Sequence, residues 1–415
     1  MDDFLKDQII NCIKYLPSNI IKSYFIKSSS EETKAFKEKT GFIRGVTSAD
    51  EGYELLRGAN IEWVRESLPA PFMKDGSVNE RYTEFKNKCL RYKEQGIKVM
   101  GITPLPNEYF NHGIDIREEG GEEKLREVSR FIINDVKDLV CGLQIANELG
   151  MPRFMVPYNM KECIRFLGIQ MEEMYPLRSN CVIGYNCAGP QVDLHLGMLP
   201  YLQYCDYVGM DMYLGCFFSL PGFTWLFDVM VRYLWAFTRK PIVMQEFGYI
   251  GGGKPRSRKE KDEILKSYGF NNEKEAKKDI MKFVDSLSPH FRGHVKFVCG
   301  EDKKVTESFM FSGDMTNHLY KELPRITVIP GMPHTPEGQA KFFKKVINRL
   351  YKLPFMCGLI IYCYSDFPNC GYCGQTDCPT ETLWGLVDIN RKPKPSYYAV
   401  KEAYGKIKEN EKKIK

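Results

Sequence analysis

The chain alternates short apolar runs with longer amphipathic ones from about residue 41 onward. The longer runs place apolar residues three and four positions apart, which is the helical period. This alternation is typical of βα units on a parallel sheet. Eight runs are predicted as strands: Gly41–Val46, Ile61–Arg65, Ile97–Ile102, Val140–Asn147, Cys181–Tyr185, Tyr207–Tyr213, Pro241–Glu246 and Gly358–Tyr362.

Helical runs fall between these strands, for example NERYTEFKNKCLRYKEQG, GEEKLREVSRFIINDVKDL and PEGQAKFFKKVINRLYKLP. The first ends at Gly96, a residue that commonly terminates helices. Eight strands alternating with helices make up a (β/α)8 barrel, whose core needs about 250 residues. The 415 residues therefore predict a single (β/α)8 TIM barrel with insertions, in preference to two domains.

Two segments extend this predicted barrel, which occupies residues 41–415. Residues 1–40 form a lysine-rich helical lead-in that a serine turn interrupts at Ser28–Ser30. A long insertion after strand seven covers about residues 251–334 and contains the helix-like segment NNEKEAKKDIMKFVDSL. Insertions at this end of a barrel usually build substrate pockets or lids.

Composition and charge exclude several function classes. The chain is 43% hydrophobic and 27% charged, which is typical of a soluble globular protein. The net charge is +6 without a basic stripe, so we expect no nucleic-acid partner.

The start MDDFLKDQIINCIKYLP lacks a secretory signal, which predicts a cytoplasmic protein. The run FTWLFDVMVRYLWAF favours core packing over a membrane helix. The oligomeric state stays open.

Fourteen cysteines raise the question of disulfides or metal. Several, such as Cys141, Cys181 and Cys357, lie inside apolar runs and are predicted to be buried free thiols. The cluster CGYCGQTDC is different, because Cys370, Cys373 and Cys378 could bind zinc together with a fourth ligand. The chain has no second Cys-x-x-Cys pair, so we predict no obligate metal site and no cofactor.

Two strand-like runs each end at a glutamate: LVCGLQIANE at Glu148 and KPIVMQE at Glu246. A carboxylate beside a core is costly to desolvate, so two such positions indicate paired acid/base chemistry in preference to solvated loop carboxylates. Glycosidic bond cleavage needs one carboxyl group to protonate the leaving oxygen and another to attack the sugar or activate water. Both glutamates would lie at the C-terminal ends of strands, where barrel enzymes have their active sites.

An Asn-Glu pair ending strand four and a Glu ending strand seven resemble the catalytic pair of glycoside hydrolase clan A, the retaining barrel glycosidases. The stretch LWGLVDINRKPKPSYYAVKEAY is similar to family-two catalytic barrels, and the overall likeness is of the family-two or family-five type. The resemblance implies that Glu148 is the acid/base, Glu246 the nucleophile and Asn147 a donor to the sugar 2-hydroxyl. It further implies that Arg65 in WVRE and Tyr213 in YVGMDMY hold the nucleophile ionised.

Aromatic residues stack against sugar rings, and Tyr362, Tyr364, Trp384 and Trp225 fall in or near the predicted loops at this end. Together with Arg65, Asn147, Tyr213 and the nearby Asp366 of IIYCYSDF, the first three complete the candidate substrate-binding set.

The sequence departs from the family patterns at three places. Tyr362 replaces the tryptophan usual on strand eight, and Asp211 stands where family five has histidine. Thr382, Leu383 and Trp384 replace the Asn and Lys that family-two β-glucuronidases have before a glycine. A uronate carboxylate would lose its cationic partner there, so we expect neutral glycosides to be preferred.

These patterns predict a retaining β-glycosidase that hydrolyses β-linked glycosides or oligosaccharides through a glycosyl-enzyme intermediate. Carbohydrate is the expected binding partner, without nucleic acid or membrane. A transglycosylase on the same fold, a non-catalytic carbohydrate-binding barrel and a protein organised by zinc at the Cys370 cluster stay open as alternatives.

Overall fold

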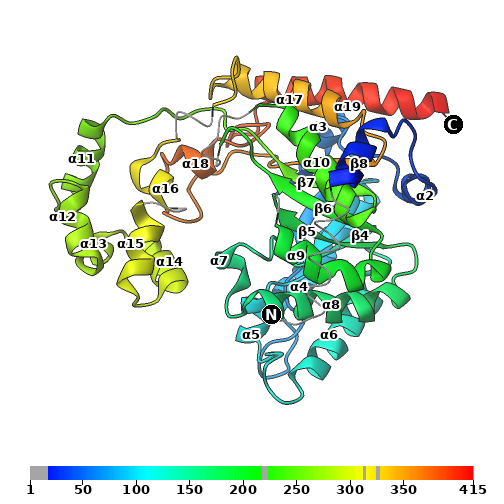
Figure 1. The fold of residues 1–415 in the computed structure, drawn as a ribbon, viewed down its shortest axis with the longest axis horizontal. Helices are drawn as coiled ribbons and strands as arrows, with labels where there is room; N and C mark the ends of the chain where they lie inside the picture. The colour runs from blue at the N-terminus through cyan, green and yellow to red at the C-terminus, as the bar shows by residue number, and fades with distance from the viewer. Residues whose placement is uncertain (1–16, 190, 217–222, 312–314, 324–327, 415) are drawn as a thin grey trace.

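Eight parallel strands close into a barrel in the computed structural model of this protein (Figure 1). The structure describes residues 17–414 except 190, 217–222, 312–314 and 324–327. Each strand pairs with its successor, and β8 pairs with β1. The strands are β1 Ile43–Thr47, β2 Trp63–Ser67, β3 Lys98–Ile102, β4 Gly142–Ile145, β5 Val182–Ala188, β6 Tyr207–Met212, β7 Ile242–Phe247 and β8 Met356–Ile361.

The barrel prediction is confirmed, and every predicted strand forms close to its predicted place. The largest difference is at the end of β5, which runs to Ala188 instead of Tyr185. All six residues of β6 and all six of β8 are buried, because their faces contact the barrel interior on one side and the helical layer on the other. Strands buried on both faces need near-continuous apolar runs, which is why the sequence pattern identified them.

Helices cover the outside of the barrel. They are α3 Tyr53–Gly58, α4 Glu80–Glu94, α5 Pro106–Asn111, α6 Gly121–Val136, α7 Pro152–Met155, α8 Met160–Leu177, α9 Val192–Met198, η1 Leu199–Tyr204, α10 Trp225–Thr238, α17 Pro336–Leu350, α18 Pro379–Thr382 and α19 Pro395–Ile414. The helices predicted at α4, α6 and α17 all form. At α4 the Asn79 side chain accepts a hydrogen bond from the first turn, and Gly96 follows the helix with a φ of 69°.

The lead-in closes the N-terminal end of the barrel. Residues 17–25 are helical, as is α2 Glu31–Thr40, whose first turn Ser30 caps. Phe36 of α2 is buried with Trp63 and Tyr207 of the barrel interior, and its ring lies 5.7 Å from that of Tyr207. The prediction for residues 1–16 lies outside the described residues.

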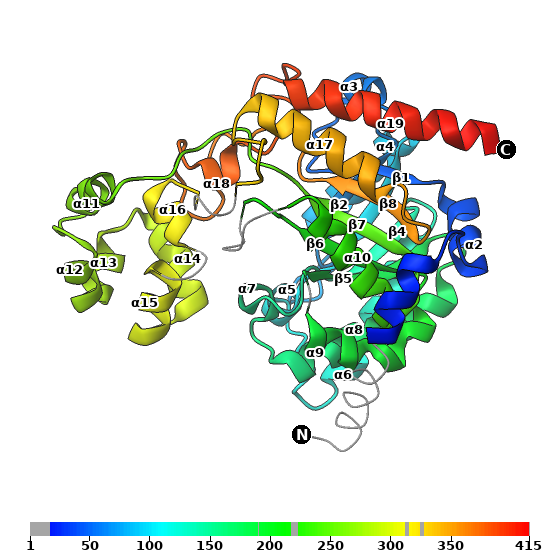
Figure 2. The ribbon, with the colours of Figure 1, turned by 45° about the horizontal axis from the view of Figure 1, so that its top comes forward.

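The insertion forms a helical lobe with its own hydrophobic core. Its helices are α11 Arg258–Ser267, α12 Glu273–Lys278, α13 Ile280–Ser286, α14 Pro289–Cys299, α15 Lys303–Phe311 and α16 Thr316–Tyr320. The lobe extends from the side of the barrel that carries α7 and α18 (Figures 1 and 2). Its core includes Phe283, Phe291 and Leu319, and also the three cysteines that follow β8.

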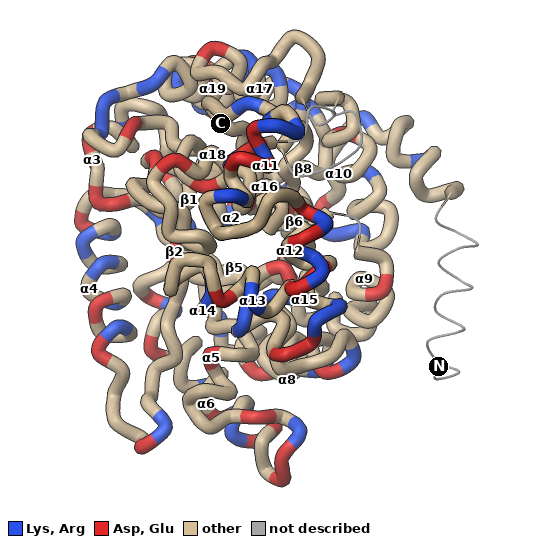
Figure 3. The backbone as a smooth tube through the Cα atoms, turned by 90° about the vertical axis from the view of Figure 1, so that its left-hand side faces the viewer, with Lys and Arg blue, Asp and Glu red and all other residues tan. Residues whose placement is uncertain are grey.

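One detail of the lobe differs from the sequence prediction. The segment NNEKEAKKDIMKFVDSL forms two short helices, α12 and α13, with a break at Asp279. Asp is a weak helix former because its side chain competes for nearby backbone groups. Figure 3, which views the side that lies on the left in Figure 1, shows acidic and basic positions interspersed along α4 and α12. Among the described helices, none combines the length and the apolar character that crossing a bilayer requires.

The close packing of neighbouring strands predicts that two glycine-to-alanine substitutions have different effects on stability. A Cβ atom on Gly184 of β5 would lie 2.4 Å from the carbonyl oxygen of Tyr207, which is backbone of β6 and cannot move away easily. Gly184→Ala should lower stability by about 1–3 kcal/mol or more. Gly293→Ala, in exposed helix α14 with no atom within 4 Å of the new Cβ, should be neutral or stabilise by up to about 1 kcal/mol. Thermal melting of both variants tests this, and equal melting points would contradict the packing argument.

Candidate active site

The turn after β4 presents two of the candidate residues. The strand ends at Ile145, and both Ala146 and Glu148 then adopt positive φ angles, of 52° and 49°. Such angles are uncommon for non-glycine residues and persist where surrounding contacts impose them. Here the hydroxyl of Thr103 accepts the Ala146 N–H at 2.9 Å, and the Asn186 side chain accepts the Glu148 N–H at 2.8 Å. The turn is therefore held from β5 and from the end of β3.

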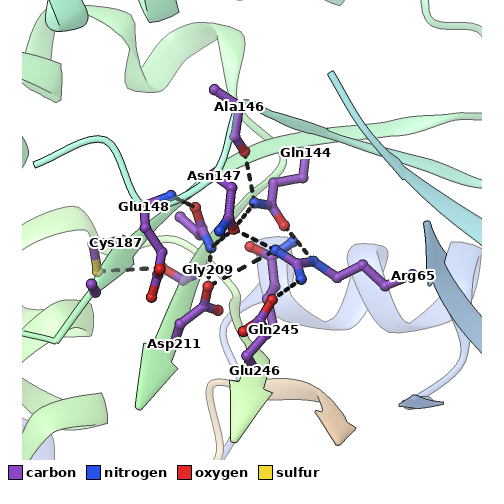
Figure 4. A network of polar contacts seen from close by, with 12 residues as sticks. Arg65, Gln144, Ala146, Asn147, Glu148, Cys187, Gly209, Asp211, Gln245 and Glu246 are labelled. Carbon is purple, nitrogen blue, oxygen red and sulfur yellow. Dashed lines mark hydrogen bonds and ion pairs between the residues drawn. The ribbon is translucent and has the colours of Figure 1, made fainter. Parts of the chain in front are cut away.

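Arg65 of β2 lies at the centre of the site (Figure 4). It is 3% exposed and donates to Gln144 at 2.7 Å and to Asn147 at 2.6 Å. It also forms an ion pair with Glu246 of β7. Burial alone would lower the pKa of Arg65, but the charges of Glu246 and Asp211 raise it above its usual value. One buried cation thus joins residues from strands two, four and seven.

Glu246 is held through both carboxylate oxygens. Arg65 donates to one oxygen, and the hydroxyl of Tyr213 donates to the other. Burial, and next the charge of Glu246, raise the pKa of Tyr213 well above its usual value, so its hydroxyl stays protonated and donates. The Glu246 side chain keeps 13% of its surface exposed. Glu246 is therefore fixed in orientation and still accessible.

The oxygen of the Asn147 side-chain amide accepts hydrogen bonds within the site, which leaves its NH2 group as the end that can face a ligand. Its side-chain oxygen accepts hydrogen bonds from Arg65 at 2.6 Å, Gln144 at 3.0 Å and Asn186 at 3.0 Å. Three donors around one atom determine which end of the amide is the oxygen. The opposite end, the NH2 group, is then the end that can donate to a ligand.

Asp211, near the end of β6, adds a third carboxyl group to Glu148 and Glu246. One of its oxygens accepts from Asn186 at 2.6 Å, while the other is buried without a hydrogen-bond partner among the described residues. Burial, followed by the charge of Glu246, raises the pKa of Asp211 well above its usual value, and Glu148 adds to this rise. Figure 4 shows Asp211 between the Glu148 and Glu246 side chains. Three carboxyl groups therefore lie in one network with the Arg65 guanidinium.

A cavity of about 400 Å³ opens beside this network. Arg65, Asn147, Glu246 and Tyr362 line it, together with residues from the ends of β1, β2 and β3. Glu148 directly follows Asn147 and is 7% exposed. The structure therefore brings Glu148, Glu246, Arg65, Asn147, Tyr213 and Tyr362 to one place at the C-terminal end of the barrel.

Trp384 packs against two tyrosines of the site. It is 1% exposed, and its ring lies edge-on to Tyr213 at 5.1 Å and to Tyr362 at 5.5 Å. Its indole N–H donates to the carbonyl of Thr380 in α18. Trp384 therefore supports the two tyrosines and does not line the cavity.

The remaining candidates lie apart from this cluster. Tyr364 is buried against Gly52 in the loop after β1. Asp366 pairs with Lys394 at 2.9 Å and accepts the Gly385 N–H at 2.7 Å, which ties together the loop after β8. Trp225 begins α10, is 48% exposed and stacks on Phe223 at 6.1 Å.

Gln144, Asn186 and Glu381 escaped sequence reasoning, and Asp211 entered it only as a departure from the family-five pattern. Gln144, Asn186 and Asp211 lie within strands, where the sequence offered one signal, a polar residue inside an apolar run. Glu381 lies in α18 and accepts a hydrogen bond from the Tyr362 hydroxyl at 3.2 Å. Burial raises the pKa of Glu381, and His318 and Arg153 partly offset that rise.

Several solved structures are similar to this chain in fold. The catalytic domain of a family-53 glycoside hydrolase from Ignisphaera aggregans matches at 16% identity and a TM-score of 0.52, over 88% of this chain and 96% of that one. A family-39 glycoside hydrolase from Bacteroides cellulosilyticus matches at 12% identity and 0.50, over 89% and 64%. A β-glucuronidase from Bacteroides uniformis matches at 12% and 0.50, over 87% and 35%.

No protein-family profile and no curated protein sequence matches this chain. At identities this low the structural likeness concerns the fold. The predicted resemblance to clan A barrels is confirmed at that level, because solved glycoside hydrolase structures share the barrel across most of this chain.

The raised pKa of Asp211 predicts a pH-dependent effect of Asp211→Asn. A carboxyl group whose pKa is raised on folding stabilises the folded state at low pH, and this contribution is lost as pH rises through the folded pKa. Asparagine stays neutral at every pH. The stability advantage of Asp211→Asn over the wild type should therefore grow between about pH 4 and about pH 8.

Denaturant unfolding across that pH range measures this effect. Asp193→Asn, at an exposed position of α9, is the matched control and should show no such trend. An advantage of Asp211→Asn that shrinks with rising pH would show that Asp211 is ionised in the folded protein.

Proposed function

We propose that this protein is a retaining β-glycosidase in which Glu246 is the nucleophile and Glu148 the acid/base. The observation that carries the proposal is the pairing of Glu246 with Arg65, because the same guanidinium also binds Asn147, the neighbour of Glu148. Through this guanidinium the segments that carry the two carboxyl groups, at the ends of strands four and seven, are joined, and a paired glycosidase mechanism requires two such groups.

In the first step Glu246 attacks the anomeric carbon while Glu148 protonates the leaving oxygen. The nucleophile suits this role because Arg65 and Tyr213 fix both of its oxygens before substrate binds. The bond to the leaving group breaks as the bond to the Glu246 carboxylate oxygen forms. The products of this step are the aglycone alcohol and a glycosyl ester on Glu246.

In the second step Glu148, now a carboxylate, takes a proton from water, and the water oxygen attacks the anomeric carbon. The ester bond to Glu246 breaks, and the sugar leaves with its original β configuration after two inversions. Asn147 supports both steps in this proposal, since its NH2 group is the free end of the amide and can donate to the sugar 2-hydroxyl.

Electrostatics favour the same reaction class. The transition state of glycoside cleavage resembles an oxocarbenium ion, which carries positive charge on the sugar ring. Glu148 and Glu246 lie on either side of Asp211, and Arg65 lies on the side of the network away from Glu148 (Figure 4). A carboxylate held against the sugar stabilises this developing positive charge most strongly where water is excluded, and Glu246 takes that position in the proposal.

Variants of the two glutamates test the assignment through opposite stereochemical outcomes. Glu246→Ala should lose nearly all activity, a loss of roughly 10³-fold or more, because no glycosyl ester can form. Added azide should then attack directly and yield the α-glycosyl azide. Glu148→Ala should still form the ester from substrates with activated leaving groups, and azide should speed turnover and yield the β-glycosyl azide.

Proton NMR of the first-formed sugar and of the azide adducts provides the measurement. Tyr364→Phe is the control, since its hydroxyl has no hydrogen-bond partner among the described residues and lies away from the cavity. A first-formed α anomer would disprove retention. Sugar binding without any cleavage would favour a carbohydrate-binding barrel, and transfer to an added alcohol in preference to water would favour a transglycosylase.

Thr382, Leu383 and Trp384, which stand in place of an Asn and a Lys, predict a preference for neutral sugars over uronic acids. Arg153 of α7 contacts the rings of Phe154 and Tyr372, and its charge acts on Glu381. An unpaired substrate carboxylate costs about 1–3 kcal/mol, which corresponds to about 5- to 150-fold in kcat/KM. Aryl β-glucuronide should therefore be cleaved more slowly than aryl β-glucoside, and β-galacturonide more slowly than β-galactoside. Faster cleavage of either uronide would contradict this.

A further inference from the structure

Three cysteines and a histidine converge where the helical lobe meets the barrel. His318 lies in α16 of the lobe, whereas Cys370, Cys373 and Cys378 lie between β8 and α18. All four side chains are buried, none being more than 2% exposed. Their ligand atoms all lie within 4.8 Å of one another.

The distances agree with one tetrahedral centre. Zinc binds thiolate sulfur at about 2.3 Å and histidine nitrogen at about 2.0–2.1 Å, so sulfur and nitrogen at two corners of a tetrahedron lie about 3.6 Å apart. The Nδ1 atom of His318 lies 3.3 Å from the sulfur of Cys370 and 3.4 Å from that of Cys378. The histidine ring is therefore already oriented as a ligand toward two of the thiols.

The backbone around Cys370 and Cys373 has the form of a metal-binding turn. The Cys373 N–H points at the Cys370 sulfur at 3.5 Å, and such N–H groups stabilise a metal-bound thiolate. Gly374 has a φ of 71°, which lets the chain reverse, and its N–H donates to the Cys370 carbonyl at 2.8 Å. Cys370 and Cys373 are thus held with both sulfurs on the inside of one tight turn.

We propose that His318, Cys370, Cys373 and Cys378 bind one structural zinc ion. Three thiolates and one imidazole complete a four-coordinate shell, and such closed sites hold zinc without leaving a position for substrate. The sequence expectation of no obligate metal site rested on the absence of a second Cys-x-x-Cys pair. The fourth ligand is instead His318 of α16, which lies 52 residues before Cys370.

The position of the site indicates what the metal does. The three cysteines form part of the lobe core, so zinc connects α16 of the lobe to the chain that leaves β8. Cys378 directly precedes α18, and α18 contributes Glu381 and Thr380, which bind Tyr362 and Trp384. Zinc binding therefore holds both the lobe and the strand-eight wall of the proposed sugar site. This last consequence depends on the proposed function, whereas the metal site itself does not.

Metal content of purified protein tests the site directly. Full-length protein prepared without chelators should contain about one zinc per chain by elemental analysis. Cys378→Ser should lose most of it. Cys299→Ser is the matched control, because Cys299 is a buried cysteine of the same lobe core outside the cluster, and this variant should keep its zinc.

Cobalt substitution reports the ligand set without reference to activity. Co²⁺ in place of zinc should give the intense visible absorption of a tetrahedral site and a thiolate-to-cobalt charge-transfer band. Both signals should survive in Glu246→Ala, which removes the proposed nucleophile while leaving the metal ligands intact. If these signals appear while no glycoside is cleaved, the metal proposal stands and the proposed function fails.

A titration of the wild type keeps the proposal testable if Cys378→Ser does not fold. Stepwise addition of a mercurial thiol reagent should release about one zinc per chain to a chromogenic chelator, and the melting temperature should fall in parallel. Three outcomes would overturn the proposal: no zinc in the protein and no cobalt uptake, a disulfide among the three cysteines, or bound iron in place of zinc.

Discussion

The buried guanidinium of Arg65 is the interaction on which the rest of the site depends. Taking such a charge out of water costs several kcal/mol unless hydrogen bonds and an opposite charge compensate it. Glu246 supplies the charge, and Gln144 and Asn147 supply the acceptors. Because these partners come from β4 and β7, the barrel must close correctly before Arg65 is satisfied. The same interactions that compensate the Arg65 charge therefore also hold the strand ends and the candidate site in place.

The sequence could predict the barrel, and the positions of Glu148 and Glu246 at the ends of β4 and β7, because both signals are local. Strands buried on two faces give continuous apolar runs, and a glutamate ending such a run is conspicuous. Asp211 and Asn186 could not be assigned in this way. Their contact depends on how β5 and β6 are aligned, with Ala188 opposite Asp211, and a sequence without known register does not specify which strand neighbours meet.

The segment after β8 shows a second reason why the sequence could not predict the whole site. In a regular strand Tyr362 and Tyr364 would share a face, since side chains alternate with a period of two. The strand ends at Ile361, however, and beyond it the alternation no longer applies. Tyr362 reaches the cavity, whereas Tyr364 packs against the loop after β1 and Asp366 turns to Lys394. Residue type alone could not separate these three neighbours. Nor could spacing find His318, because its helix belongs to the lobe.

The helical lobe presents a stability problem that the cysteine cluster can solve. A unit of about 60 residues buries too little apolar surface for its core to be strongly stable alone, and small units of this kind often rely on metals or disulfides. The lobe core includes Cys370, Cys373 and Cys378 from the chain after β8, so the proposed zinc would crosslink the junction instead of the inside of the lobe. A crosslink at that position would order the lobe and the segment from Cys378 to Trp384 together. Because Glu381 and Trp384 of this segment contact Tyr362, it would also fix the wall of the cavity that Glu246 lines.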